Sequence, residues 1–343
     1  MLELVNETGA GAVLVPGWNL EGQHRQVLVA RLTLSFDLQG RLWVADEQSP
    51  PLLTDQHYGK PLESSVAGAS EIAGFKQGAE YYLHGSACTR TGQESQARVS
   101  VGLEQGGRHY YKELVALGGH QWEKALIGSR RGEPAAFASL PLRYENAYGG
   151  SVGQGGQREK HNPVGRGFNP SGWKVADTRA PQIEYPGRAA LSPSQRMPVA
   201  GFGPLPVFWA PRRARFGTSP EDPLSGQVCP WGSDADPALH HCAPEDQWLA
   251  RPFAGGELLT LMGFFADHSA PVELKLPRWQ PQALLIRRGG PAECLATTCD
   301  TLVIDTEQRQ LALIARTMVD PERLGVSPAW LQLRAASMLE EAC

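Results

Sequence analysis

The feature that most constrains the fold is a long central stretch, residues 149–211, in which glycine and proline recur and no helical or strand period is present. Glycine reaches backbone conformations that are closed to other residues, and proline fixes φ. Irregular stretches of this length are usually functional loops or linkers, but linkers rarely contain many aromatic residues. We therefore expect an ordered irregular layer, packed on a core, that includes the aromatic residues Phe168, Trp173, Tyr185, Phe202, Phe208 and Trp209.

Strand patterns flank the central stretch on both sides. In residues 27–36 apolar side chains alternate along one face, and the turn 37–40 leads into a returning strand at 41–45. Short strands separated by turns are typical of a β-sandwich or barrel. We predict a mainly β protein with further strands at residues 80–88, 96–103, 109–117, 257–265, 271–276, 283–287, 301–305 and 310–317.

The same patterns place a boundary near residue 150. Residues 1–150 are expected to form a sandwich-like or barrel-like N-terminal β domain, and residues 151–343 to hold the irregular layer and a second β part. The alternative is that the later strands complete the first sheet, so that the chain forms one compact unit. Near the end, Ser327 suits an N-cap and Pro328 a first helical residue, which predicts a short C-terminal helix to about Glu341.

Charge and hydropathy disfavour several classes of protein. The formal net charge is −4, whereas nucleic-acid-binding domains usually show a basic patch. No apolar stretch approaches the ~20 residues of a membrane helix, and the N-terminus lacks the basic start and apolar run of a signal peptide. We therefore expect a cytoplasmic protein without nucleic-acid or membrane partners, in which most of the six cysteines are free thiols.

A possible metal site is the first chemical candidate. Cys229, His240, His241 and Cys242 are all potential zinc ligands. Their spacing matches no zinc-finger pattern, and adjacent residues of an extended chain point to opposite faces. The chain also lacks a phosphate-binding lysine motif, a GxSxG elbow and a helical HExxH motif. We expect no metal, no cofactor and no catalytic residue, while a ligand role for these four residues stays open.

The alternative is a carbohydrate-active or metal-dependent hydrolase. The nine tryptophans suit a sugar site, and the cluster from Cys229 to Cys242 suits a metal. Glycosidase chemistry needs two carboxyl groups at a set separation across a cleft. Glu145, Asp246 and Glu257 are the candidates, but the sequence does not define the distances between them.

Three segments combine aromatic residues with glycine and proline most densely: residues 140–150 (LPLRYENAYGG), 162–168 (NPVGRGF) and 198–212 (PVAGFGPLPVFWAPR). We call them the three motifs. They either fold the second half of the chain or form a preshaped surface for a protein partner, where Trp, Tyr and Arg are favoured anchors. On the second interpretation, the predicted partner-binding residues are Tyr148, Phe208, Trp209 and Arg212.

The first two motifs resemble the signature of a bacterial family designated domain of unknown function 2169. The later segments 201–204, 209–212 and 243–247 fit the same family, and the resemblance runs from roughly residue 10 to residue 317. It implies a non-enzymatic cytoplasmic adaptor or chaperone of the type VI secretion system. Such a protein binds a cognate toxic effector and assists its stabilisation and its loading onto the secretion spike. The implied partners are the effector and a spike or spike-tip protein.

Overall fold

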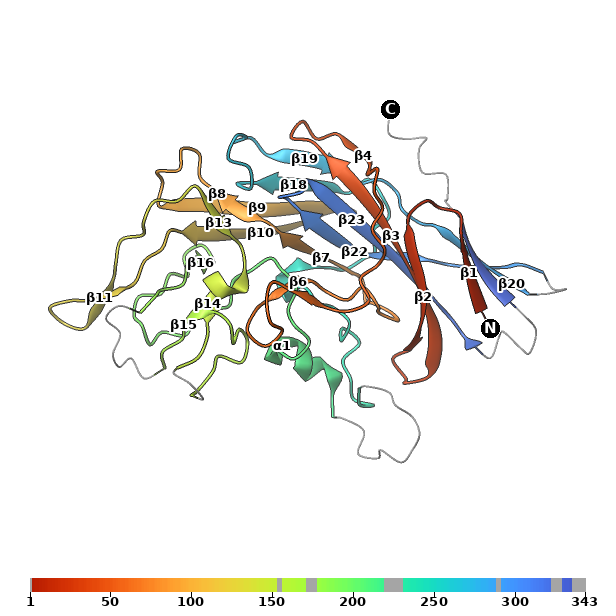
Figure 1. Cartoon of the computed structure of the whole chain (residues 1–343), viewed down its shortest axis with the longest axis horizontal. Helices are drawn as coiled ribbons and strands as arrows, with labels where there is room; N and C mark the ends of the chain where they lie inside the picture. The colour runs from red at the N-terminus through yellow and green to blue at the C-terminus, as the bar shows by residue number, and fades with distance from the viewer. Residues whose placement is uncertain are drawn as a thin grey trace.

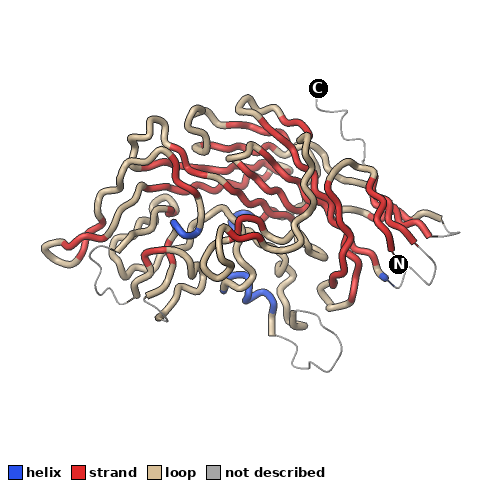
Figure 2. The backbone as a smooth tube through the Cα atoms, in the orientation of Figure 1, coloured by secondary structure: helices blue, strands red, loops and turns tan. Residues whose placement is uncertain are grey.

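The computed structural model describes residues 2–152, 156–170, 178–218, 231–287, 291–321 and 329–334. Within these ranges strands dominate, as Figures 1 and 2 show, and the prediction of a mainly β protein is confirmed. The helical elements there are short. They are α1 (Ala210–Arg213) and the 3-10 turns η1 (Tyr144–Asn146), η2 (Ala214–Phe216) and η3 (Glu245–Gln247).

A seven-stranded sheet forms the centre of the molecule and takes strands from both halves of the chain. The predicted hairpin is present, because β3 pairs with β4 across a turn in which Gly40 has a φ of 86°. The sheet runs in the order β17 (Trp248–Leu249), β7 (Ala79–His84), β22 (Thr298–Asp305), β23 (Gln310–Val319), β3 (His24–Phe36) and β2 (Gly11–Trp18), with β4 (Leu42–Val44) beside β3.

A five-stranded sheet packs face to face on the seven-stranded sheet. Leu32 and Leu313 of the larger sheet share one buried core with Val101 and Leu261 of the smaller one. The packing is that of an open β-sandwich, in which alternate side chains of both inner faces form the core. The second sheet runs in the order β16 (Ile183–Glu184), β10 (Arg108–Leu117), β9 (Gln96–Gln105), β18 (Leu258–Met262) and β19 (Val272–Lys275).

The other face of the seven-stranded sheet is covered by irregular segments. Val29 and Ile314 of the sheet pack there with Val66 and Cys242. The irregular layer also contributes to the main core, because Phe202 and Trp209 are fully buried in it. The central strands are therefore buried on both faces, which explains their nearly continuous apolar sequences.

A four-stranded sheet extends the sandwich at the end where the N-terminus lies (Figure 1). The predicted C-terminal helix is wrong for residues 329–334, which form a strand. Leu331 and Leu333 alternate into the core, and pairing with two neighbouring strands satisfies the backbone. Residues 327, 328 and 335–343 lie outside the described residues. The sheet runs in the order β1 (Leu2–Asn6), β24 (Ala329–Arg334), β20 (Gln282–Arg287) and β21 (Glu293–Leu295).

Strands from residues 1–150 and 151–343 interleave in both large sheets, so the two segments share their cores. In the described part of the chain, no helix has the length and apolar character that crossing a membrane requires. Four small two-stranded sheets complete the fold: β5 (Gln56–His57) with β6 (Val66–Gly68), β8 (Ser86–Cys88) with β13 (Ser139–Pro141), β11 (Trp122–Lys124) with β12 (Ser129–Arg131), and β14 (Tyr148–Gly149) with β15 (Arg166–Gly167).

Candidate functional site

A groove with a volume of about 600 Å³ opens in the irregular layer. Its walls combine parts of the first and third motifs with the segment 243–247, which are distant in sequence. The volume is in the range of ligand-binding clefts. The residues that line the groove are Tyr144, Glu159, His161, Tyr185, Arg196, Met197, Pro198, Val199, Leu205, Pro211, Arg215, Pro244, Glu245 and Asp246.

Tyr144 joins the first and third motifs at the groove. Its hydroxyl donates to the carbonyl of Gly203 at 2.9 Å, and its ring lies edge-on to Trp209 with 5.3 Å between the ring centroids. Gly201 lies so close to the same ring that a Cβ at this position would collide with it. Position 201 must therefore be glycine as long as Tyr144 occupies this place. The contact between the two residues gives this part of the groove a defined shape.

Lys112 reaches the groove wall from the buried face of β10. Its ammonium is buried and donates to the Gly201 carbonyl at 2.6 Å, Asp246 Oδ1 at 2.7 Å and Gln247 Oε1 at 2.7 Å. Burial lowers the pKa of Lys112 to about 8, although the Asp246 carboxylate opposes this shift. The second oxygen of Asp246 accepts from the Tyr185 hydroxyl at 2.8 Å. Asp246 is thereby held in a fixed position while its side chain stays 40% exposed.

Two further ion pairs lie around the groove. The buried Glu159 carboxylate contacts Arg196 at 3.3 Å and His161 at 2.9 Å. The buried Arg215 guanidinium contacts Glu245 at 3.1 Å and lies over the Trp248 ring. Met197 and Leu205 line the same groove and are buried, whereas Arg196 and Glu245 are exposed. The groove therefore has an apolar floor and a charged rim, the usual anatomy of a protein-binding patch.

The four predicted partner-binding residues do not form one exposed surface. Tyr148, Trp209 and Arg212 are buried. Trp209 packs in the main core, Tyr148 packs beside Trp122, and Arg212 donates to the Leu205 carbonyl at 2.9 Å. Phe208 is half-buried and stacks with His57. Trp209 and Tyr148 shape the layer from within, and a partner-binding role stays a prediction for all four residues.

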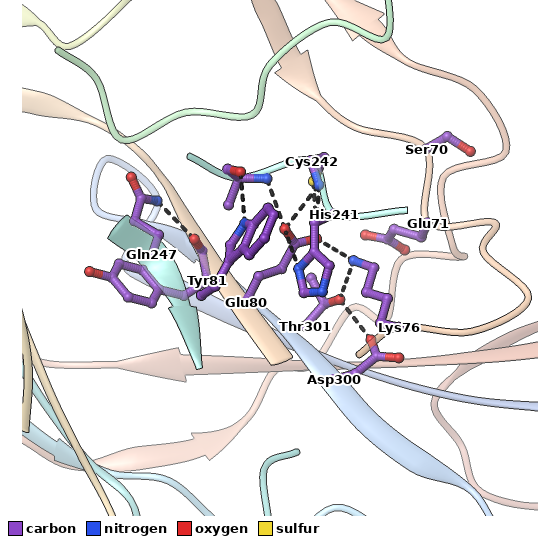
Figure 3. Close-up of polar contacts among 12 residues, drawn as sticks. Ser70, Glu71, Lys76, Glu80, Tyr81, His241, Cys242, Gln247, Asp300 and Thr301 are labelled. Atoms are coloured by element: carbon purple, nitrogen blue, oxygen red, sulfur yellow. Dashed lines mark hydrogen bonds and ion pairs between the residues drawn. The ribbon is translucent and has the colours of Figure 1, made fainter. Parts of the chain in front are cut away.

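A buried polar network connects the irregular segments to the seven-stranded sheet (Figure 3). Glu80 of β7 is at its centre and forms an ion pair with Lys76. The Glu80 carboxylate also accepts from the backbone N–H groups of Cys242 at 2.9 Å and Ala243 at 2.8 Å. Burial acts to raise the pKa of Glu80, but Lys76 and His241 outweigh it and hold that pKa well below its usual value. The network thus fixes residues 242–243, which directly precede groove residues 244–246.

The network continues across β22 and β23. Thr301 accepts from Lys76 at 2.7 Å and donates to Asp300 at 2.8 Å. Asp300 lies at a β-bulge and pairs with Arg316 at 2.8 Å, and Arg316 also donates to the Glu71 carbonyl. Bulges redirect side chains out of the regular alternation. This one brings a carboxylate and a hydroxyl into the same buried network.

The proposed zinc ligands have other contacts. His241 Nε2 lies 3.0 Å from the Gln77 carbonyl, and the Cys242 thiol donates to Glu80. His240 packs between the rings of Phe75 and Trp231, and Cys229 lies outside the described residues. Within the described ranges, no group of three or more His, Cys, Asp and Glu residues is arranged to hold a metal ion.

The three candidate glycosidase carboxylates are in different settings. Glu145 accepts from the N–H and hydroxyl of Ser65 at 2.7 and 2.6 Å. Glu257 accepts from the N–H groups of Ala254 and Gly255 at 2.7 and 3.0 Å. Of the three, Asp246 is the one that lines the groove. The hydrolase alternative stays a prediction that an activity assay on polysaccharides would test.

His240 should make the fold sensitive to acid. Burial, followed by the nearby charges of Arg316 and Lys76, lowers the pKa of His240 from 6.5 to about 3. Between these values the unfolded chain binds more protons, so stability falls as the pH falls. As the pH falls, the free energy of unfolding of a His240→Phe variant should therefore decrease less steeply than that of the parent. The two slopes should differ by up to about 1.4 kcal/mol per pH unit. Urea unfolding at a series of pH values measures both slopes, and equal slopes would contradict this assignment.

A second exposed feature is the tip of the β11–β12 hairpin, which projects from one end of the molecule (Figure 1). Leu126 and Ile127 at the tip are 103% and 91% exposed. The base is well anchored, because Trp122 is buried and Arg131 forms an ion pair with Glu184 at 2.9 Å. An anchored hairpin that presents two adjacent aliphatic side chains to solvent is a candidate contact point for a protein.

Sequence reasoning missed Lys112 as the residue that holds Asp246 at the groove wall, although a signal was present. Side chains alternate between the two faces of a strand, so Lys112 lies on the same face of β10 as Tyr110, Leu114 and Ala116. A charged side chain is thus expected on an otherwise largely apolar face. A buried lysine needs a partner, but no sequence pattern identifies Asp246 as that partner. The groove residues Arg196 and Met197 were also missed, and they lie in a stretch without any period.

Fold and site together define an open β-sandwich protein with a groove in the irregular layer that covers its sheets. The chain matches the family described as an uncharacterized protein conserved in bacteria (DUF2169) over residues 21–316. Because this match spans most of its length, the chain belongs to that family. No curated protein and no solved structure matches it.

Proposed function

We propose that this protein is a cytoplasmic adaptor or chaperone without catalytic activity, which binds a cognate type VI secretion effector and assists its stabilisation and its loading onto the spike. The observation that supports this proposal most directly is the convergence of sequence motifs on one groove. Tyr144, Pro211 and Asp246 come from three separate segments that carry the family resemblance, and all three line it.

The composition of the groove suits reversible binding. Apolar floor residues such as Met197, Val199 and Leu205 offer surface to an apolar part of the client. The exposed charged groups of the rim, Arg196 and Glu245, remain hydrated and contribute to the choice of partner. A loading adaptor must hold its client firmly enough to protect it and must then release it, and a cleft of moderate size with a polar rim meets both requirements.

Val199→Asp tests the groove as the client site. An unpaired carboxylate on the apolar floor should weaken binding of the effector by about 30-fold or more, since burying a charge without a partner costs at least 2 kcal/mol. The measurement is co-purification and titration calorimetry with the effector encoded beside this gene. The matched control is Val5→Asp on β1, where the same substitution falls on an exposed residue outside the groove. A folded Val199→Asp protein that retains parental affinity would exclude this site.

The hairpin tip provides a candidate for the second contact that an adaptor needs. A double substitution of Leu126 and Ile127 by serine should leave effector binding unchanged and weaken association with the spike or spike-tip protein. Each buried aliphatic side chain contributes about 1.5–3 kcal/mol to such a contact. Pull-down with the purified spike protein measures the effect, with the exposed Leu62→Ser as control. If the double variant binds the spike as the parent does, the tip is not a contact.

A further inference from the structure

We infer that the groove takes an uncharged, extended segment of the client, and this inference rests on the proposed function. Its basis is the balance of charge around the cleft. Glu159 faces Arg196 at 3.3 Å, and Glu245 faces Arg215 at 3.1 Å. Each carboxylate at the rim therefore already has a cation as its partner.

The charge of the third carboxylate, Asp246, is balanced by a lysine that lies beneath the groove wall. Lys112 contacts it at 2.7 Å and is itself buried, outside the cleft. Its other two donors are used by Gly201 and Gln247, so the ammonium has no proton left for a ligand. Three carboxylates and three strong cations leave no net charge on the groove. A charged client group would lose water here without gaining an unpaired counter-charge, which is unfavourable.

Asp246 also indicates the conformation of the segment. Each of its two oxygens accepts one hydrogen bond, from Lys112 and from Tyr185. A carboxylate has about four acceptor positions, so acceptor capacity remains on its exposed side. Backbone N–H groups are available in an extended segment, whereas those of a helix are already paired. The fixed carboxylate therefore suits a main-chain donor, while the apolar floor accepts the side chains on either side of it.

Three synthetic peptides test the inference without knowledge of the client. The three peptides share the same extended core of valine, proline and leucine residues. They differ only at the central position of the peptide, which is serine, lysine or glutamate. The serine peptide should bind at least about tenfold more tightly than the other two by fluorescence anisotropy. Its affinity should change less than about twofold between 50 mM and 500 mM NaCl, because no net charge is involved. Tighter binding of a charged peptide, or a strong salt dependence, would overturn the inference.

Substitution of Asp246 by asparagine should change the preference in a defined direction. Asparagine keeps the shape of the groove wall but leaves the positive charge of Lys112 unbalanced. The affinity for the glutamate peptide should therefore rise by at least about tenfold relative to the affinity for the serine peptide. Glu273→Gln, an exposed carboxylate on β19, is the matched control and should change nothing. An unchanged preference in the Asp246→Asn protein would contradict the charge balance, and circular dichroism checks that this variant folds.

The peptide results and the proposed function can fail separately. If the serine peptide binds and Val199→Asp abolishes that binding, but no neighbouring effector co-purifies, the inference stands and the proposed function fails. If the effector binds in the groove but no peptide binds or displaces it, the proposed function stands and the inference fails.

Discussion

Substitution of Glu80 by alanine should lower the free energy of unfolding by about 3–5 kcal/mol, the range for removing one partner of a buried ion pair. The Glu80 carboxylate is completely buried, and it is the anion that pairs with the Lys76 ammonium. Its loss would leave that ammonium without its paired anion, and the N–H groups of Cys242 and Ala243 without their acceptor. Urea denaturation followed by tryptophan fluorescence measures the effect.

Two controls separate burial from the mere loss of a charge. Glu63→Ala removes a carboxylate from an exposed pair with Lys60 at 3.7 Å and should cost less than about 1 kcal/mol. The double variant Lys76→Met/Glu80→Leu removes both charges and should be more stable than Glu80→Ala alone. If Glu80→Ala costs no more than the surface control, the network does not hold the irregular layer on the sheet.

Substitution of Lys112 by methionine should cost about 2–4 kcal/mol. Methionine fills much of the same space but donates no hydrogen bond, so the Gly201 carbonyl and the Gln247 side chain lose a buried donor. Each unsatisfied buried acceptor costs about 1–3 kcal/mol. The Asp246 side chain is 40% exposed and can bind water in place of the lysine, so its lost contact adds less to the cost in stability. The variant should also bind the effector more weakly, because Asp246 loses one of its two fixed contacts.

The pH dependence of stability provides a second measurement for Lys112. Its pKa of about 8 in the folded protein lies below the ordinary 10.5, so the unfolded state binds more protons between these values. The stability of the parent should therefore rise with pH across this window relative to Lys112→Met. Parallel curves for the two proteins would show that the buried ammonium does not titrate there.

Local patterns in the sequence predict the strands well. Alternation in residues 27–36 and 310–317 matches β3 and β23, because period two follows from backbone geometry alone. The helix predicted at the C-terminus was wrong at residues 329–334, where the same residues also alternate and strand pairing with β1 and β20 decides the outcome. Capping residues indicate where a helix could begin. They do not prevent the same segment from pairing with the edge of a neighbouring sheet.

The sequence did not indicate how deeply the predicted partner-binding residues are buried. Tryptophan, tyrosine and arginine are favoured at interfaces, but the same side chains also fill irregular cores. Trp209 is buried in the main core, and Tyr148 is buried in a smaller cluster with Trp122. Residue type alone does not distinguish these two environments.

By itself, the sequence determined the β class, the positions of the main turns, the irregular layer and the motifs of the family, since each of these depends on residues close together in the chain. The tertiary structure alone decided where the groove lies and what charge it carries. Lys112 and Asp246 are 134 residues apart, and Glu80 and Cys242 are 162 apart. Such pairs form only when strands from both halves of the chain enter common sheets, so no local pattern specifies them.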